Sequence, residues 1–137
     1  MIDRPSLTNF GLAYVTAVVV LGALDAAWLG GIAKNFYRQE IGPLLNETPQ
    51  LLPAAAFYLL YPLGLVYLVL TPFPGSLGEA ATRAAVVGLL AYGAYDLTNL
   101  STLRGWSWRL SMVDWAWGTF VTTVTGAVVY WVVHRWR

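Results

Sequence analysis

The sequence predicts an all-α membrane protein, a bundle of four transmembrane helices with an interfacial amphipathic segment between helices 1 and 2. Hydrophobic residues make up 58% of the 137 residues and charged residues only 11%, whereas a soluble domain carries about 25% charged residues. The apolar residues also gather in four runs, each close to the ~20 residues that a helix needs to cross the hydrocarbon core. We therefore expect residues 1–137 to form a single integral membrane domain.

The first apolar run, residues 8–32, is interrupted by one charge, Asp25. This run is too long, and its basic flank too weak, for a signal peptide, so it predicts the first transmembrane helix. Residues 33–50 mix charged and apolar side chains, and Pro43 should kink or end any helix there. Because the apolar positions recur at helical spacing, they predict an amphipathic segment lying in the membrane interface, with an ordinary polar loop as the alternative. These positions are Tyr37, Ile41, Leu44 and Leu45.

Three further apolar runs predict helices at about 51–71, 80–102 and 110–133. An even number of crossings would place both termini on the same side of the membrane. Four Lys or Arg residues would then lie on each side, so the positive-inside rule gives no orientation. The free amino terminus and the basic carboxyl end favour termini in the cytoplasm, in a bacterial inner membrane.

The composition excludes several kinds of site. The chain has no cysteine, and His134 is its only histidine, so it cannot form a thiolate nucleophile, an iron–sulfur cluster or a His/Cys metal site. We predict no metal ion, and the sequence identifies no cofactor. The basic residues are few and scattered, which argues against a nucleic-acid partner.

The polar residues of the predicted helices gather at one depth. Asp25 lies late in the first helix, Asp96 late in the third and Asp114 early in the fourth, so all three fall in the leaflet opposite the termini. An ionisable residue inside a membrane span indicates a functional site by default. We predict that these three aspartates converge in one pocket as catalytic groups. The predicted substrate-binding residues around them are Trp28, Tyr58, Tyr61, Tyr92, Tyr95, Asn99 and Trp117.

Carboxyl groups that lie close together in a low dielectric repel one another, so at least one should keep its proton at neutral pH. A protonated and an ionised carboxyl beside tyrosines can perform acid–base catalysis, and the same set can relay protons in a transporter. The structural alternative is a set of interhelical hydrogen bonds, each contributing about 0.6 to 2 kcal/mol. We expect Asn to be tolerated best at Asp25, because the first helix offers only Trp28 as a polar neighbour.

Two classes of function fit these features. The first is a small membrane enzyme that acts on a lipid or another hydrophobic molecule by acid–base catalysis. The second is a non-catalytic protein, either a proton-coupled carrier of a small apolar or cationic solute or an accessory subunit of a larger complex; a homo-oligomer is an open alternative. Near the termini the helices are mostly Ala, Val, Leu and Gly, and only Thr122 and Thr125 extend polar character in that direction. This favours a pocket open to one side, and hence an enzyme or binding protein.

Several sequence blocks together resemble a known family. They are Asp25-x-x-Trp28, Phe57-Tyr58-x-x-Tyr61, Tyr95-Asp96-Leu97-Thr98-Asn99-Leu100, Arg104-Gly105-Trp106 and Asp114-x-x-Trp117-Gly118. In these blocks the chain resembles the bacterial DUF2177 family, small four-span membrane proteins of unknown function. The resemblance covers nearly the whole chain and implies the four-span fold and the importance of these blocks. It implies no reaction, substrate or cofactor.

Overall fold

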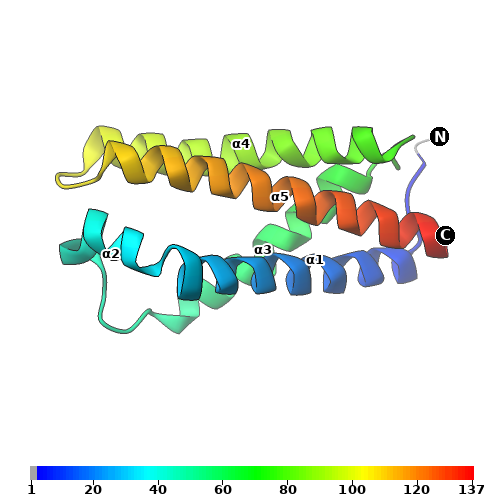
Figure 1. The fold of residues 1–137 in the computed structure, drawn as a ribbon. Helices are drawn as coiled ribbons and strands as arrows, with labels where there is room; N and C mark the ends of the chain where they lie inside the picture. Colours follow the sequence, from blue (N-terminus) through cyan, green and yellow to red (C-terminus); the bar gives the residue numbers. More distant parts are fainter. Residues whose placement is uncertain (1–2) are drawn as a thin grey trace.

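The structure is a computed structural model that describes residues 3–137, and all the regular structure in that range is helical. The all-α prediction is therefore confirmed. The four long helices run alongside one another, with α3 crossing obliquely, and both chain ends lie at the same end of the bundle (Figure 1). The helices are α1 (Leu7–Ala27), α2 (Lys34–Ile41), α3 (Leu51–Leu70), α4 (Leu77–Thr102) and α5 (Trp108–Trp136), with a π-helical turn at Trp28–Ile32 and a 3₁₀ turn at Gly42–Leu44.

Serine caps determine where three of the long helices begin. The hydroxyl groups of Ser6, Ser76 and Ser107 each accept a hydrogen bond from a backbone N–H three residues further on. Such a cap contributes about 1 kcal/mol, because it satisfies a donor that the helix leaves free. As a result α4 and α5 begin two or three residues earlier than the apolar runs predicted, at Leu77 and Trp108.

The first predicted helix, about residues 8–32, corresponds to the helical segment Leu7–Ile32, whose last turn is a π-helix rather than an α-helix. α1 stops at Ala27, and Trp28–Ile32 form a π-helical turn in which the N–H of Ala33 donates to the carbonyl of Trp28 at 2.8 Å. Hydrogen bonds over five residues widen the helix and usually occur as single turns. Gly30 and Gly31 have the low helix propensity that permits this change. The wider turn redirects the chain into α2.

Three helical segments are long and apolar enough to cross a membrane: Leu7–Ile32, Leu51–Leu70 and Trp108–Trp136. The predicted four-span bundle is thus shown only in part. α4 has the length of a crossing, with 26 residues, but charged side chains at Glu79, Arg83 and Asp96 make it less apolar than the other long helices.

α2 packs against one end of the bundle. Ile41 is buried there, and Glu40 accepts a hydrogen bond from the Ser107 hydroxyl at 2.7 Å, which joins α2 to the start of α5. The helix ends at Ile41, two residues before Pro43, so Leu44 and Leu45 do not continue its apolar face and remain about half exposed. The interfacial position of residues 33–50 therefore stays a prediction.

The half of the bundle nearest the termini is a packed apolar core. Here α4 and α5 approach closely, since a Cβ atom placed on Gly126 would lie 2.3 Å from the Cβ of Ala84. The other half, near α2, contains the three buried aspartates. The core is formed by Ala13, Ala17, Leu65, Val66, Val69, Leu70, Ala80, Ala84, Val129, Tyr130 and Val133.

Candidate functional site

A cavity of about 330 Å³ lies in the half of the bundle away from the termini. α1 with its π-helical turn, α3, α4 and α5 all contribute to its wall. The wall combines aromatic rings with two carboxyl groups, and none of the described residues that line it is basic. The lining residues are Asp25, Leu29, Phe57, Tyr58, Ala91, Tyr92, Tyr95, Asp114 and Trp117.

Asp25 is buried and accepts two hydrogen bonds from other helices. The Tyr58 hydroxyl on α3 donates to its Oδ2 at 2.8 Å, and the indole Nε1 of Trp117 on α5 donates to its Oδ1 at 2.8 Å. An indole N–H can only donate, so Asp25 is held as an acceptor on both oxygens. Trp28 is the polar neighbour that the first helix offers, but the hydrogen-bond partners of Asp25 come from helices distant in sequence.

Asp114 is 8% exposed and joins α5 to α2. Its Oδ1 accepts a hydrogen bond from the Tyr37 hydroxyl, and that hydroxyl accepts one from the Trp28 indole at 3.2 Å. The Trp28 ring in turn stacks on the Trp117 ring, with centroids 4.4 Å apart and planes inclined by 6°. The stacked tryptophans therefore connect the partners of Asp114 with those of Asp25.

Tyr37 is a site residue that the sequence did not reveal. It was counted as an apolar position of the segment 33–50, but its hydroxyl reaches Asp114, 77 residues away in the chain. Burial raises the pKa of Tyr37 well above its usual range, and the hydrogen bond to Asp114 raises it further. The phenol therefore stays protonated and remains a donor. The available signal was a hydroxyl group on the apolar face of a short helix just after the span that carries Asp25.

Asp96 occupies a different position from the other two aspartates. It is fully buried on α4 beside Asp114, and it is not among the residues that line the cavity. Neither of its carboxyl oxygens has a hydrogen-bond partner within residues 3–137. An ionised carboxylate in that position would carry a large desolvation cost. The structure thus brings Asp25 and Asp114 to the cavity and places Asp96 behind its wall.

Of the other predicted substrate-binding residues, some line the cavity and some lie outside its lining. Tyr92 and Tyr95 line the cavity, and the Tyr92 ring lies so close to Gly118 that a Cβ atom there would come within 2.0 Å of it. Tyr61 lies outside the lining and forms a 2.8 Å hydrogen bond with the Thr122 hydroxyl. Asn99 is partly buried and also lies outside the lining.

Three lining residues were absent from the predicted set: Leu29, Phe57 and Ala91. Their side chains are apolar, and an apolar residue in a membrane-length run gives no sign that it faces a cavity. Phe57 stacks on Tyr61 with ring centroids 5.1 Å apart, so its position is fixed by a residue that was predicted.

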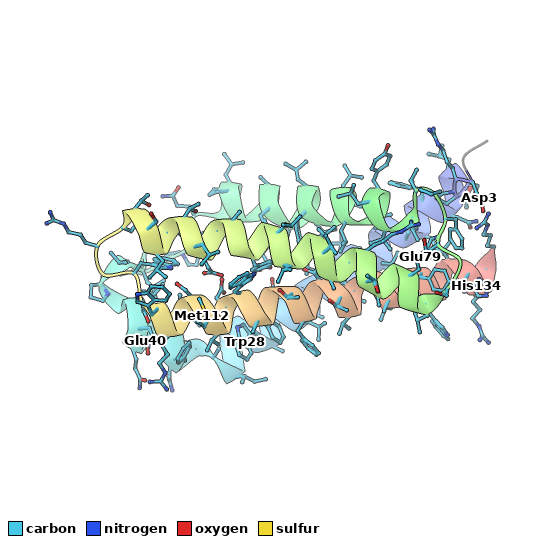
Figure 2. The ribbon with its side chains drawn as sticks, turned by 90° about the horizontal axis from the view of Figure 1, so that it is seen from above. Asp3, Trp28, Glu40, Glu79, Met112 and His134 are labelled. Carbon is cyan, nitrogen blue, oxygen red and sulfur yellow. The ribbon has the colours of Figure 1, made fainter. Side chains whose placement is uncertain are left out.

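α2 is attached to the start of α5 close to Asp114. Besides the bond from Ser107, Glu40 lies 3.7 Å from the guanidinium of Arg109, which itself lies over the Phe36 ring at 5.5 Å. Glu40 and Trp28 lie toward one end of the molecule, far from Asp3, Glu79 and His134 at the other (Figure 2). These contacts position the Tyr37 hydroxyl against Asp114.

Within residues 3–137, none of the three buried aspartates forms an ion pair. In the same range no three His, Cys, Asp or Glu side chains come together as a metal site. The site therefore contains carboxyl groups without a cationic counterpart from the protein. The ion pairs in this part of the chain are Arg83–Glu79, Arg109–Glu40 and Arg137–Asp3.

Comparison with known proteins gives one match. No curated protein and no solved structure matches the chain. The family described as "Predicted membrane protein (DUF2177)" matches residues 10–131, a range that contains the whole cavity lining and Asp96. The family resemblance seen in the sequence is thus confirmed, and the chain belongs to the DUF2177 family of predicted membrane proteins.

Proposed function

We propose that this protein is a four-span membrane enzyme that binds a lipid or another hydrophobic molecule in its one-sided cavity and performs acid–base chemistry on it. One observation carries the proposal. The cavity presents two buried carboxyl groups among aromatic rings, with a third carboxyl directly behind one of them. Buried carboxyl groups in a mostly apolar cavity are typical of an active site.

The fourth crossing in this proposal is α4. Its 26 residues rise about 39 Å, more than the ~30 Å of a hydrocarbon core. It packs closely against α5, because a Cβ atom on Gly88 would lie 2.8 Å from the Cβ of Thr122. Small residues that permit such approach are typical of helix pairs within membranes. α4 would then direct its polar residues toward α5 and the cavity.

The two cavity carboxyl groups have different surroundings, which suits them to different roles. Asp25 accepts hydrogen bonds on both oxygens and is held as a stationary negative charge. Asp114 accepts one from Tyr37, and its other oxygen has no partner within residues 3–137, so it can act on a bound molecule. Asp96, beside Asp114 and without donors, would hold a proton to exchange with it. A protonated and an ionised carboxyl side by side supply the acid and the base.

The packing of the opposite half favours an enzyme or binding protein over a carrier. Apolar side chains from α1, α3, α4 and α5 fill the half nearest the termini. A carrier would have to separate these helices to release its solute on that side. An accessory subunit of a membrane complex is the remaining alternative, and it requires no chemistry at Asp114.

The proposal can be tested by comparing the lipids of a deletion strain with those of its parent. We expect a hydrophobic species to accumulate in the deletion strain, and the wild-type gene and Glu47→Gln to restore the parental pattern. Glu47 is the matched control because it is an exposed acid in the loop before α3. Asp114→Asn should be inserted normally and fail to restore the pattern. Full restoration by Asp114→Asn would contradict acid–base catalysis and leave the accessory role.

A further inference from the structure

The charges and rings of the cavity indicate what kind of head group it accepts. We propose that the cavity binds an organic cation, an ammonium group carried either by an amphiphile or by a free amine. This inference rests on the proposed function, because it names the substrate class of the same site. Three observations support it: uncompensated carboxyl groups, an aromatic lining, and the size and edge of the cavity.

The first observation is the charge of the cavity. Asp25 and Asp114 both line it, neither forms an ion pair within residues 3–137, and no basic residue is part of the lining. Buried charges are ordinarily paired, because an unpaired one carries a large desolvation cost. A bound ammonium group would provide the missing counter-charge, whereas an anionic head group would be repelled by both carboxylates.

Asp114 offers a specific point of contact. It is more than nine-tenths buried and lines the cavity, and within residues 3–137 a hydrogen bond is donated to its Oδ1 and none to its Oδ2. Tyr37 holds this carboxyl group in place from α2, and Asp25 is held in the same way by Tyr58 and Trp117. The negative charges are therefore fixed in position before a ligand arrives.

The second observation is the aromatic lining. Five of the nine lining residues carry aromatic rings, and the faces of such rings attract cations, most strongly those of tryptophan. Rings combined with carboxylates form the kind of cage that recognises quaternary ammonium groups. A neutral hydroxyl-bearing lipid would fit the rings and could donate a hydrogen bond to a carboxylate, but it would leave both charges uncompensated. The five residues are Phe57, Tyr58, Tyr92, Tyr95 and Trp117.

The third observation is the size of the cavity. Its volume of about 330 Å³ is at the lower end of the roughly 300–1,000 Å³ of small-molecule sites, so it suits a head group better than a whole lipid. Leu29 and Phe57 line it and are 44% and 39% exposed. These apolar side chains form an edge over which an alkyl chain can leave toward the membrane.

The test uses the purified full chain in a neutral detergent and three probes. They are dodecyltrimethylammonium, choline as the free cation, and 3,3-dimethylbutanol as the neutral isostere of choline. Binding is followed by tryptophan fluorescence, which the stacked Trp28 and Trp117 should report, and by calorimetry. We expect the ammonium probes to bind and the neutral isostere not to bind. Tighter binding of the long-chain probe identifies a lipid head group as the ligand, and equal binding of choline identifies a free amine.

Variants assign the binding to the cavity. Asp114→Asn should weaken ammonium binding about tenfold or more, the loss expected when one member of a buried charge pair is removed. Tyr95→Phe, which keeps the ring, should bind better than Tyr95→Leu, and Glu47→Gln should bind like the wild type. Circular dichroism checks that each variant is folded. Should Asp114→Asn misfold, a comparison of Tyr95→Leu with Tyr95→Phe still tests the site, because Tyr95 is 53% exposed and Phe keeps its edge-to-face contact with the Trp106 ring.

Equal binding of 3,3-dimethylbutanol and choline, or unchanged ammonium binding in Asp114→Asn and in Tyr95→Leu, would overturn cation recognition. These outcomes are separable from those of the lipid comparison. A lipid change that depends on Asp114 without ammonium binding leaves the enzyme proposal intact and removes only the cation. Ammonium binding without any lipid change keeps the cation site and removes the catalytic function.

Discussion

At the scale of single residues, buried aspartate side chains occur both with and without hydrogen-bond donors. Asp25 accepts hydrogen bonds from Tyr58 and Trp117, whereas Asp96 has no donor within the described part of the chain. Three side-chain donors point at the two cavity carboxyl groups. Tyr58 and Trp117 donate to Asp25, and Tyr37 donates to Asp114. The difference shows that hydrogen-bond donors from the described residues meet the carboxyl groups at the cavity, whereas none of them meets Asp96.

Asp25→Asn should destabilise the protein by about 1–3 kcal/mol, the cost of leaving a buried polar group unsatisfied. The amide nitrogen of Asn is a donor, so facing the Trp117 indole it would meet another donor. Facing the Tyr58 hydroxyl, it would require that hydroxyl to accept and to lose the acceptor that Asp25 now provides for its own proton. Asp96→Asn should cost less, because no donor from residues 3–137 faces the carboxyl group of Asp96. Thermal denaturation of both variants in detergent measures the difference. A more stable Asp25→Asn than Asp96→Asn would contradict these hydrogen-bond assignments.

Asp96 should be protonated at neutral pH, because it is buried beside Asp114 without a donor to stabilise a negative charge. Infrared difference spectra should then show the stretch of a protonated carboxyl group that disappears in Asp96→Asn. Asp3→Asn is the control, since Asp3 is exposed at the other end of the bundle and pairs with Arg137. A spectrum unchanged by Asp96→Asn would mean that the proton lies elsewhere.

At the scale of the elements, α2 is held to the bundle by few contacts, and Tyr37 makes the central one. The sequence suggested a helix that lies in the membrane interface, which stays a prediction, and the structure adds that the Tyr37 side chain of this helix reaches the buried Asp114. Tyr37 thus links an eight-residue helix to the chemistry of the cavity. Because short helices are marginal by themselves, α2 depends on such tertiary contacts.

Tyr37→Phe should loosen α2 by about 1–3 kcal/mol, the range for hydrogen bonds to neutral and charged groups. The ring remains while the bonds to Asp114 and Trp28 are lost. Hydrogen exchange should become faster in α2 and stay unchanged in the core near Val69. The matched control is Tyr67→Phe, because the Tyr67 side chain is 55% exposed on α3. Uniformly faster exchange would indicate global destabilisation instead.

Ionisation of Tyr37 should weaken the same contact only under alkaline conditions. The pKa of Tyr37 is raised by burial and by Asp114, so folding favours the protonated phenol. This contribution is complete below the unfolded value of about 10 and is lost as the pH rises through the higher folded value. Exchange in α2 should therefore be insensitive to Tyr37 ionisation from neutral pH to about pH 10.

α4 packs so closely on α5 that a larger side chain at their contact should destabilise the protein. A Cβ atom on Gly118 would lie 2.0 Å from the Tyr92 ring, so Gly118→Ala must push that ring away from α5 and into the cavity. Overpacking of this kind costs about 1–3 kcal/mol. Gly11→Ala on α1 is the control, since no atom lies within 4 Å of the added carbon. Denaturation should show a loss for Gly118→Ala only, and equal stability of the two variants would contradict the packing.

At the scale of the whole molecule, the sequence predicts the position of a residue along the bundle better than the direction in which its side chain points. Counting along apolar runs located α3 within one residue and placed Asp25, Asp96 and Asp114 at one level. Which aspartate meets which donor depends on how each helix is rotated, and periodicity leaves that undetermined because these helices are apolar on nearly every side. The π-helical turn and the role of Tyr37 depend on contacts between residues far apart in the chain.

The number of crossings provides the last prediction. If α4 spans the membrane, the loop before α3 and the end of α4 lie on one side, and the start of α4 lies on the other. The chain has no cysteine, so single cysteines at Asn46, Gly78 and Ser101, all exposed, can report these positions. None of these substitutions alters the balance of Lys and Arg that governs insertion.

An impermeant maleimide should label Asn46→Cys and Ser101→Cys from the same side and Gly78→Cys from the opposite side. If α4 lay on the surface, Gly78→Cys and Ser101→Cys would instead be labelled together, because only a crossing between them can separate their sides. The same measurement orients the protein. With the termini in the cytoplasm, intact cells should label the cysteines at 46 and 101, and the cavity would then be on the outer side of the membrane. Labelling of only Gly78→Cys would reverse that orientation while leaving four crossings.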